Sequence, residues 1–137
     1  MSSTPRRLAA WALVLSGLLF AVGLGIHPDE SNPASLASPL WGPAHWLIAG
    51  GSMAGLFGLT GLFAVWFHRD GPIGLAAYTI HSLGFMLLIA VATIEAAVFA
   101  PLATRPEVAP LLADSGPIVG GPLGPILLAM TALLAVG

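Results

Sequence analysis

The sequence predicts an all-α integral membrane protein folded as a four-helix bundle. Hydrophobic residues occupy 57% of its 137 positions and charged residues only 7%, whereas about a quarter of an ordinary soluble domain is charged. A soluble fold of this size could not cover its surface with so few charges, so the apolar residues must face lipid. The apolar runs are long and do not alternate with polar residues, which excludes the strands of a membrane barrel.

Four apolar segments make up a single transmembrane domain. A helix needs about 20 apolar residues to cross a hydrocarbon layer of about 30 Å, and the first three segments meet this requirement. From Leu123 onwards the fourth offers only about 22 Å of helix, and Pro122 and Pro125 interrupt it. We therefore expect the last helix to be either bent or incomplete. The expected helices cover about 8–26, 44–67, 73–100 and 118–137.

The segments between these helices differ in length and composition. Residues 27–43 are rich in Pro, Ser and Asn and are expected to be irregular, and residues 68–72 form a tight polar turn. In the second long loop the stretch "PEVAPLLAD" predicts a short interfacial helix, with Pro106 near its start.

The arginines predict the orientation in the membrane. Arg6, Arg7 and Arg69 fall on one side, and Arg105 falls on the other with most of the acidic residues. The positive-inside rule then places the N-terminus in the cytoplasm. The first segment has the Arg-Arg start of a signal peptide, but its apolar run exceeds the usual length of about 7–15 residues, so we favour an uncleaved helix. Three tryptophans lie near segment ends, where aromatic belts form: Trp41, Trp46 and Trp66.

Three ionisable residues are expected at a similar depth near the outer end of the bundle. His27 ends the first segment, His45 begins the second, and Glu95 lies about 9 Å below the outer end of the third. Two histidines and a carboxylate are a ligand set for zinc and non-haem iron, so these three residues are the candidate metal site. A proton is the other cation that they could hold. The structural alternative is a protonated Glu95 that only hydrogen-bonds a neighbouring helix, beside two interfacial histidines.

A second polar pair lies deeper in the third segment. His81 and Glu95 are separated by about 40° around the helix, so they share a face with Tyr78. Because ionisable groups in membranes face the bundle interior or water, we expect His81 and Tyr78 to be buried. Haem b is a further candidate cofactor, since histidines on facing helices can bind it, but the depths of His45 and His81 match poorly.

Glycines in the second segment predict close helix packing. Gly51, Gly55 and Gly58 recur every three or four residues, and small residues at this spacing let membrane helices approach closely. We expect this face to pack within the chain, with a dimer face as the alternative.

Several function classes are excluded. A formal net charge of −2 does not suit nucleic acid, which needs a basic patch. The absence of cysteine excludes disulfides, thiolate metal sites and a catalytic thiol. The sequence contains no P-loop, nucleophile elbow, HExxH motif or dinucleotide fingerprint, so no catalytic residue is identified and a non-enzymatic role is favoured.

One combination of motifs carries a resemblance. His27–Pro28 follows the first segment, and Trp41, Pro43, Ala44 and His45 form a W-x-P-A-H motif at the start of the second. Over the first three segments this resembles a group of uncharacterised bacterial multi-pass membrane proteins. The resemblance implies an all-helical fold in a bacterial inner membrane and supplies no activity. Members of that group continue beyond the length of this chain, as an incomplete fourth helix would require.

The sequence therefore favours a small structural or accessory membrane protein, in contact with the lipid bilayer and with a membrane protein partner or further copies of itself. The alternative is a redox or sensor protein that binds a metal ion or haem b at the outer histidines and glutamate. A small transporter subunit is less favoured, because four helices enclose only a narrow pathway.

Overall fold

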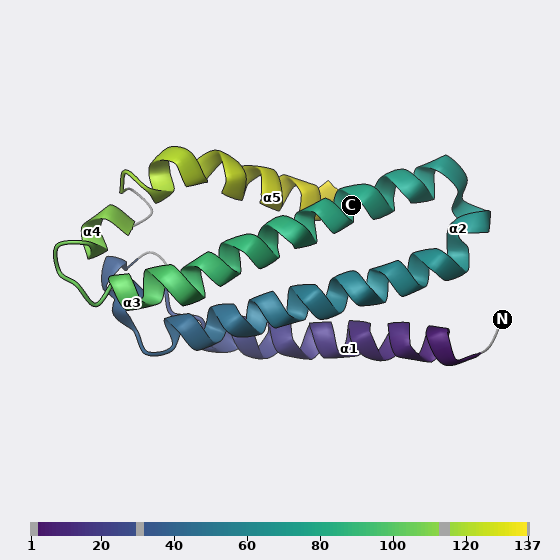
Figure 1. Cartoon of the computed structure of the whole chain (residues 1–137), viewed down its shortest axis with the longest axis horizontal. Coiled ribbons are helices and arrows are strands. Elements are labelled where there is room, and N and C mark those ends of the chain that lie inside the picture. The colour runs from purple at the N-terminus through teal and green to yellow at the C-terminus, as the bar shows by residue number, and fades with distance from the viewer. Residues whose placement is uncertain (1–2, 30–31, 113–115, 137) are drawn as a thin grey trace.

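In a computed structural model the chain is an all-α bundle, as the composition predicts. The structure describes residues 3–29, 32–112 and 116–136, without the side chains of residues 3, 33 and 67–70. Every regular element within these ranges is helical. The predicted four-helix membrane bundle is confirmed (Figure 1), because four helical stretches are long and apolar enough to cross a membrane: Thr4–Ile26, Trp41–Trp66, Gly71–Leu102 and Val119–Val136.

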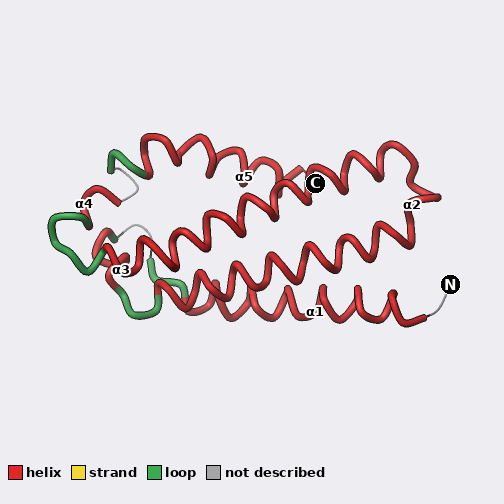
Figure 2. The backbone as a smooth tube through the Cα atoms, in the orientation of Figure 1, coloured by secondary structure: helices red, strands yellow, loops and turns green. Residues whose placement is uncertain are grey.

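The first crossing is formed by α1, Ser3–Ile26, and the next two lie largely within α2, Trp41–Ile94, which bends between them. α2 includes both the second and most of the third crossing. The chain reverses at Gly71, where φ is 54° and ψ is −143°. Glycine adopts such a positive φ readily because it has no Cβ, and Pro72 follows where a helix can start without its N–H. The tight turn expected at residues 68–72 is thus a single bend, visible in Figure 2 as the reversal of α2.

The third crossing ends in a wider helical turn. A π-helix, η2, covers Glu95–Phe99, and the short α3 follows at Ala100–Leu102. The N–H of Ala100 donates to the carbonyl of Glu95, five residues earlier. Pro101 accounts for the change, because in an α-helix its ring would clash with the carbonyl four residues before it. Glu95 itself keeps α-helical dihedral angles, and its N–H still donates to the carbonyls of Val91 and Ala92, so α2 sets the direction of its side chain.

Both long loops contain short helices. The first has a 3-10 helix, η1, at Pro33–Ala37, where Oδ1 of Asn32 accepts a hydrogen bond from the N–H of Ala34 at 3.0 Å. The second has α4 at Ala109–Leu112. A short helix is thus present in this loop as predicted, but it begins at Ala109, and Pro106 lies in the turn before it.

The fourth crossing is bent. It begins with a π-helix, η3, at Val119–Leu123 and continues as α5 at Gly124–Val136. The bend lies at Gly121, whose ψ of −108° is not helical, and Pro122 follows inside the turn. The expectation of a bent helix is thus confirmed, with the prolines as its cause.

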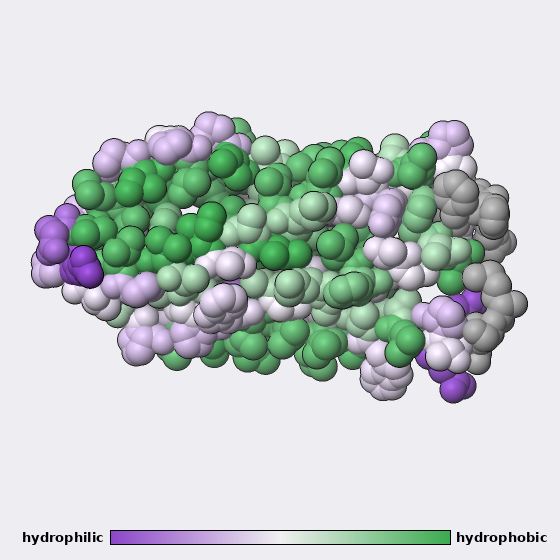
Figure 3. All heavy atoms as spheres, in the orientation of Figure 1, coloured by the Kyte–Doolittle hydropathy of each residue, from purple (hydrophilic) through white to green (hydrophobic). Residues whose placement is uncertain are grey.

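The best-covered part of the molecule is the end that carries the two long loops. Elsewhere large apolar side chains are exposed, as lipid contact requires; Phe57 is 75% and Ile73 is 83% exposed. Hydrophilic residues gather at the two ends of the long axis, and the surface between them is apolar (Figure 3). The long axis therefore crosses the membrane. The core at the loop end consists of Leu36, Trp41, Phe99, Ala103, Leu112 and Val119.

Small residues bring α1 close to the second crossing. A Cβ added to Gly58 would lie 2.6 Å from Cγ of Leu13, and one added to Gly55 would lie 2.9 Å from Oγ of Ser16. Gly51 also faces α1, with side-chain and backbone atoms of that helix within 3.3 Å of an added Cβ. The glycine face thus packs against helices of the same chain.

Candidate functional site

His45 lies in the first turn of α2 and is only 4% exposed. Its Nδ1 is 2.8 Å from the carbonyl oxygen of Trp41, one helical turn earlier. A carbonyl oxygen only accepts hydrogen bonds, so Nδ1 of His45 carries a proton and donates it. In the neutral ring, Nε2 is then left with a lone pair.

His27 follows α1 directly, and its ring is held in the same way. Its Nδ1 is 2.8 Å from the carbonyl oxygen of Pro28 and donates to it. Its Nε2 lies 3.2 Å from Nε2 of His45. The two rings meet edge to face with centroids 4.7 Å apart.

Glu95 reaches the same point from the start of the π-helix η2. Its Oε2 contacts Nε2 of His45, and its side chain is 20% exposed. Nε2 of His45 is therefore the centre of a polar cluster, with His27 on one side and Glu95 on the other. The structure thus brings together the three residues that the sequence places at a similar depth.

The polar cluster brings together more acceptor atoms than donors. Because both Nδ1 atoms donate to carbonyls, neutral His27 and His45 present only lone pairs at Nε2, and an ionised Glu95 adds further lone pairs. Such atoms repel one another unless a proton lies between them. One proton among the three residues balances the carboxylate charge, and a neutral cluster carries the smallest penalty in a membrane.

Trp41 belongs to this site, and sequence reasoning missed it. It is 5% exposed, whereas the other two tryptophans expected in the aromatic belts, Trp46 and Trp66, are 53% and 42% exposed. Its ring lies against both imidazoles, with centroids 5.1 Å from His27 and 4.8 Å from His45. The signal in the sequence is the four-residue spacing from Trp41 to His45, which places both on one helix face.

The indole nitrogen of Trp41 is an unusual donor. Nε1 is buried and has no hydrogen-bond partner among the described residues. A buried donor without an acceptor costs roughly 1–3 kcal/mol. Trp41 therefore packs well as a ring while its N–H is left unsatisfied.

A cavity of about 600 Å³ adjoins the polar cluster and Trp41. Its polar lining is completed by Thr131 of α5. The rest of the wall is apolar and comes from all four crossings and from both long loops, including Phe20, Leu36, Leu88, Leu112 and Leu127. Apolar walls with a few convergent polar groups are typical of small-molecule sites.

The two other predicted polar residues lie elsewhere. His81 and Tyr78 are half-buried, not buried as predicted. The Tyr78 hydroxyl is 3.2 Å from Oγ1 of Thr60, and the Tyr78 ring stacks on Phe63 at 4.2 Å. Both line a separate cavity of about 400 Å³. Sharing a helix face does not bring His81 to Glu95, because about 21 Å of helix axis separates them.

The arrangement of His27, His45 and Glu95 does not provide a metal or haem site. Within the part of the chain that the structure describes, no three His, Cys, Asp or Glu side chains are placed to hold a metal ion together. A haem iron between His27 and His45 would need two metal–nitrogen bonds of about 2 Å on opposite sides, which exceeds the 3.2 Å between the two Nε2 atoms. In this arrangement the cluster suits a proton.

Comparison of the chain with models of protein families, with curated proteins and with solved structures finds no match. The polar cluster and its cavity are therefore the basis for a functional proposal.

Proposed function

We propose that this membrane protein binds a small, uncharged and largely apolar molecule that carries a carbonyl or hydroxyl oxygen. The observation that carries the proposal is the cavity of about 600 Å³ beside the polar cluster, whose lining includes Trp41. The indole N–H of Trp41 is buried and has no partner among the described residues, and a small turn of the indole would present it to the cavity. A ligand oxygen that accepts this hydrogen bond removes the cost of the unsatisfied donor.

The cavity walls favour a flat, apolar ligand. A volume of about 600 Å³ falls within the range of small-molecule sites. The rings of His27, Trp41 and His45, with centroids 4.7 to 5.1 Å apart, provide an aromatic surface for stacking. A lipid-soluble quinone combines the required features, namely a flat ring, carbonyl oxygens, no charge and an apolar tail.

The polar cluster gives the ligand a second donor. A proton on Nε2 of His27 or on the carboxyl of Glu95 can be directed to a ligand oxygen as well as to Nε2 of His45. Occupation of the cavity is thereby coupled to the position of the shared proton. This role is closer to a redox or sensor protein than to a purely structural one.

The setting proposed for this activity is a bacterial inner membrane, with the N-terminus in the cytoplasm. Its support is the sequence resemblance and the distribution of arginines. Arg6 and Arg7 lie at the start of α1, and Arg69 lies beside the bend of α2 at the same end of the bundle.

The proposal is tested by quinone binding to the protein in lipid nanodiscs. We expect saturable binding of a decyl-chain benzoquinone. Trp41→Phe keeps the ring but removes the donor, so the affinity should fall about fivefold to tenfold. Trp46→Phe changes an exposed tryptophan outside the cavity lining and should leave the affinity unchanged. Equal affinities of the two variants, or no saturable binding, would refute the proposal.

A structural or accessory role is the second candidate, and one observation favours it. The polar cluster joins the end of α1, the start of α2 and the end of the third crossing, which is what a joint between helices requires. This role predicts loss of stability on disruption of the cluster, with no ligand binding. A stoichiometric transition metal in the purified protein, lost in Glu95→Gln, would instead support the metal hypothesis.

A further inference from the structure

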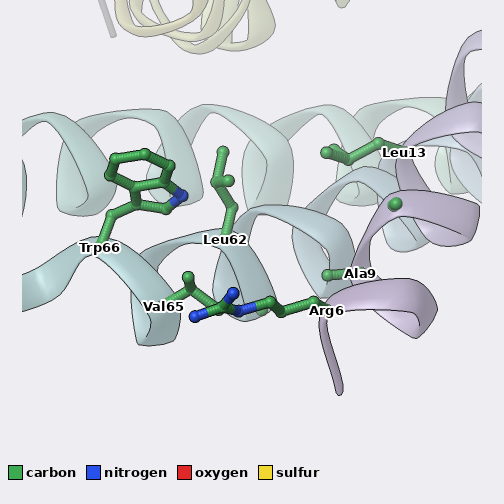
Figure 4. Close-up of a pocket in the computed structure, with 8 residues that line it drawn as sticks. Arg6, Ala9, Leu13, Leu62, Val65 and Trp66 are labelled. Atoms are coloured by element: carbon green, nitrogen blue, oxygen red, sulfur yellow. The ribbon is translucent and has the colours of Figure 1, made fainter. Parts of the chain in front are cut away.

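A second groove lies at the opposite end of the bundle from the polar cluster. It has a volume of about 380 Å³ and runs between the start of α1 and the end of the second crossing. Figure 4 shows the side chain of Arg6 extending from α1 to Val65 on α2. The rest of its lining is apolar apart from the indole N–H of Trp66: Ala9, Ala10, Leu13, Gly61, Leu62, Val65 and Trp66.

The groove exists because small residues line its floor. A Cβ added to Gly61 would lie 2.5 Å from Cβ of Ala9, so the two backbones are in close contact there. Larger side chains stand on either side of this contact, Leu13 on α1 and Leu62 and Trp66 on α2. A furrow therefore remains on the surface that faces lipid.

The groove begins at the edge of the membrane and leads inwards. The first crossing starts at Thr4 and the second ends at Trp66, so Arg6 lies within one helical turn of the boundary. From Arg6 to Leu13 the groove extends about 10 Å along the helix. Its cationic end is at the depth of lipid head groups, and its apolar end is at the depth of acyl chains.

We propose that this groove is a binding site for an anionic phospholipid. The guanidinium of Arg6 can bind a phosphate through two parallel hydrogen bonds, and one acyl chain fills the apolar part beside Ala10 and Leu13. The order of charged and apolar parts along the groove matches the order in a phospholipid. Anionic lipids are also the species that basic residues at this membrane surface attract.

The charge of Arg6 favours a lipid over a second copy of the chain as the occupant of the groove. A protein partner at this groove would have to offer an acidic group to Arg6. Among the acidic residues that the structure describes, Asp29, Glu95 and Glu107 lie at the other end of the molecule, and Asp70 beside the bend of α2 is the exception. A head-group phosphate is available at this depth in every part of the surrounding bilayer.

The experiment uses two adjacent arginines as a matched pair. The protein in detergent is mixed with equal amounts of phosphatidylglycerol and phosphatidylcholine, and bound lipid is counted by native mass spectrometry. We expect the wild type to prefer phosphatidylglycerol by about tenfold, because the choline cation of phosphatidylcholine offsets the charge of its phosphate, whereas phosphatidylglycerol presents a net negative charge to Arg6. Arg6→Gln should abolish the preference. Arg7→Gln removes the same charge from a residue outside the groove and should retain it.

A third variant tests the apolar part. Ala10 is exposed, so Ala10→Phe fills the groove without disturbing helix packing and should lower the retention of both lipids. If Arg6→Gln and Arg7→Gln lowered the preference for phosphatidylglycerol equally, the proposal would be overturned, since general surface charge would then explain the binding. A protein dimer that Ala10→Phe dissociates, with lipid retention unchanged, would also overturn it. None of these outcomes affects quinone binding at the polar cluster, so the two proposals fail separately.

Discussion

Nε2 of His45 is the single atom on which the polar cluster depends. The ring cannot turn away, because its Nδ1 is bonded to the carbonyl oxygen of Trp41 and its faces are packed against Trp41 and His27. Its Nε2 must therefore meet both His27 and Glu95. Whatever charge Glu95 carries is transmitted to both histidines through that atom.

We expect Glu95→Gln to change the protonation of the histidines while leaving the fold intact. The Gln amide can donate to the lone pair on Nε2 of His45, so the free energy of unfolding should change by less than about 1 kcal/mol. The variant cluster has one acceptor fewer and one donor more, so its hydrogen bonds no longer need an additional proton. At neutral pH, nitrogen-15 NMR of labelled histidine should show a doubly protonated or proton-sharing ring in the wild type and only neutral rings in the variant.

The matched control for this change is Glu107→Gln, an exposed residue in the second long loop. It should leave the histidine spectrum as it is in the wild type. If the wild type already shows only neutral rings, and Glu95→Gln leaves them unchanged, the histidines do not hold the extra proton.

At the scale of elements, the contact between α1 and the second crossing depends on the absence of side chains. An added Cβ at Gly55 would lie within 2.9 Å of Oγ of Ser16 and within 2.8 Å of Cζ of Phe85. Gly55 therefore has helices on two sides, from α1 and from the third crossing. A branched side chain at this position would separate both contacts at once.

Gly55→Leu should lower the thermal midpoint in detergent more than Leu56→Ala does. Overpacking costs about 1–3 kcal/mol or more, whereas Leu56 is only half-buried and its truncation should cost about 1 kcal/mol. If the thermal midpoint of Leu56→Ala were lower than that of Gly55→Leu, close packing at the glycine face would not be what holds the helices together.

The sequence predicts the elements well because lipid imposes a simple rule on them. Each crossing needs a long apolar helix, so the crossings could be placed from residue type alone. The convergence of His27, His45 and Glu95 could also be foreseen, since depth follows from position along a helix. The burial of Trp41 could not, because an interfacial tryptophan faces lipid or the core according to how the first loop folds over it. The π-helix at Glu95–Phe99 likewise depends on a local clash at Pro101 that hydropathy does not register.

The whole molecule is asymmetric along the membrane normal. Both long loops, the polar cluster and the main core lie at one end, and the N-terminus and the bend of α2 lie at the other (Figure 1). The end with the loops is closed by packed side chains, while the opposite end carries the groove at Arg6. The two proposed sites therefore face opposite membrane surfaces.

This arrangement predicts the accessibility of introduced cysteines. The natural sequence contains none, so Ala37→Cys and Pro72→Cys can be labelled without background, and both positions are exposed. A membrane-impermeant maleimide should label Ala37→Cys only from outside intact cells and Pro72→Cys only after the cells are opened. Labelling of both from the same side would rule out the hairpin formed by α2.

The π-helix at Glu95–Phe99 also has a consequence for how the length of this chain can vary. In this turn the N–H of Ala100 bonds the carbonyl of Glu95, five residues earlier. In an α-helix the corresponding bond spans four residues, so the π-helix contains one extra residue. Loss of Ala97, which is exposed, would convert this turn to an ordinary α-helical one and leave the helix on either side in register. Loss of one residue from the regular part of α2 would instead rotate every later position by about 100°. The π-helix is thus a point at which the chain can lose one residue without dismantling the bundle or moving Glu95 out of its place on α2.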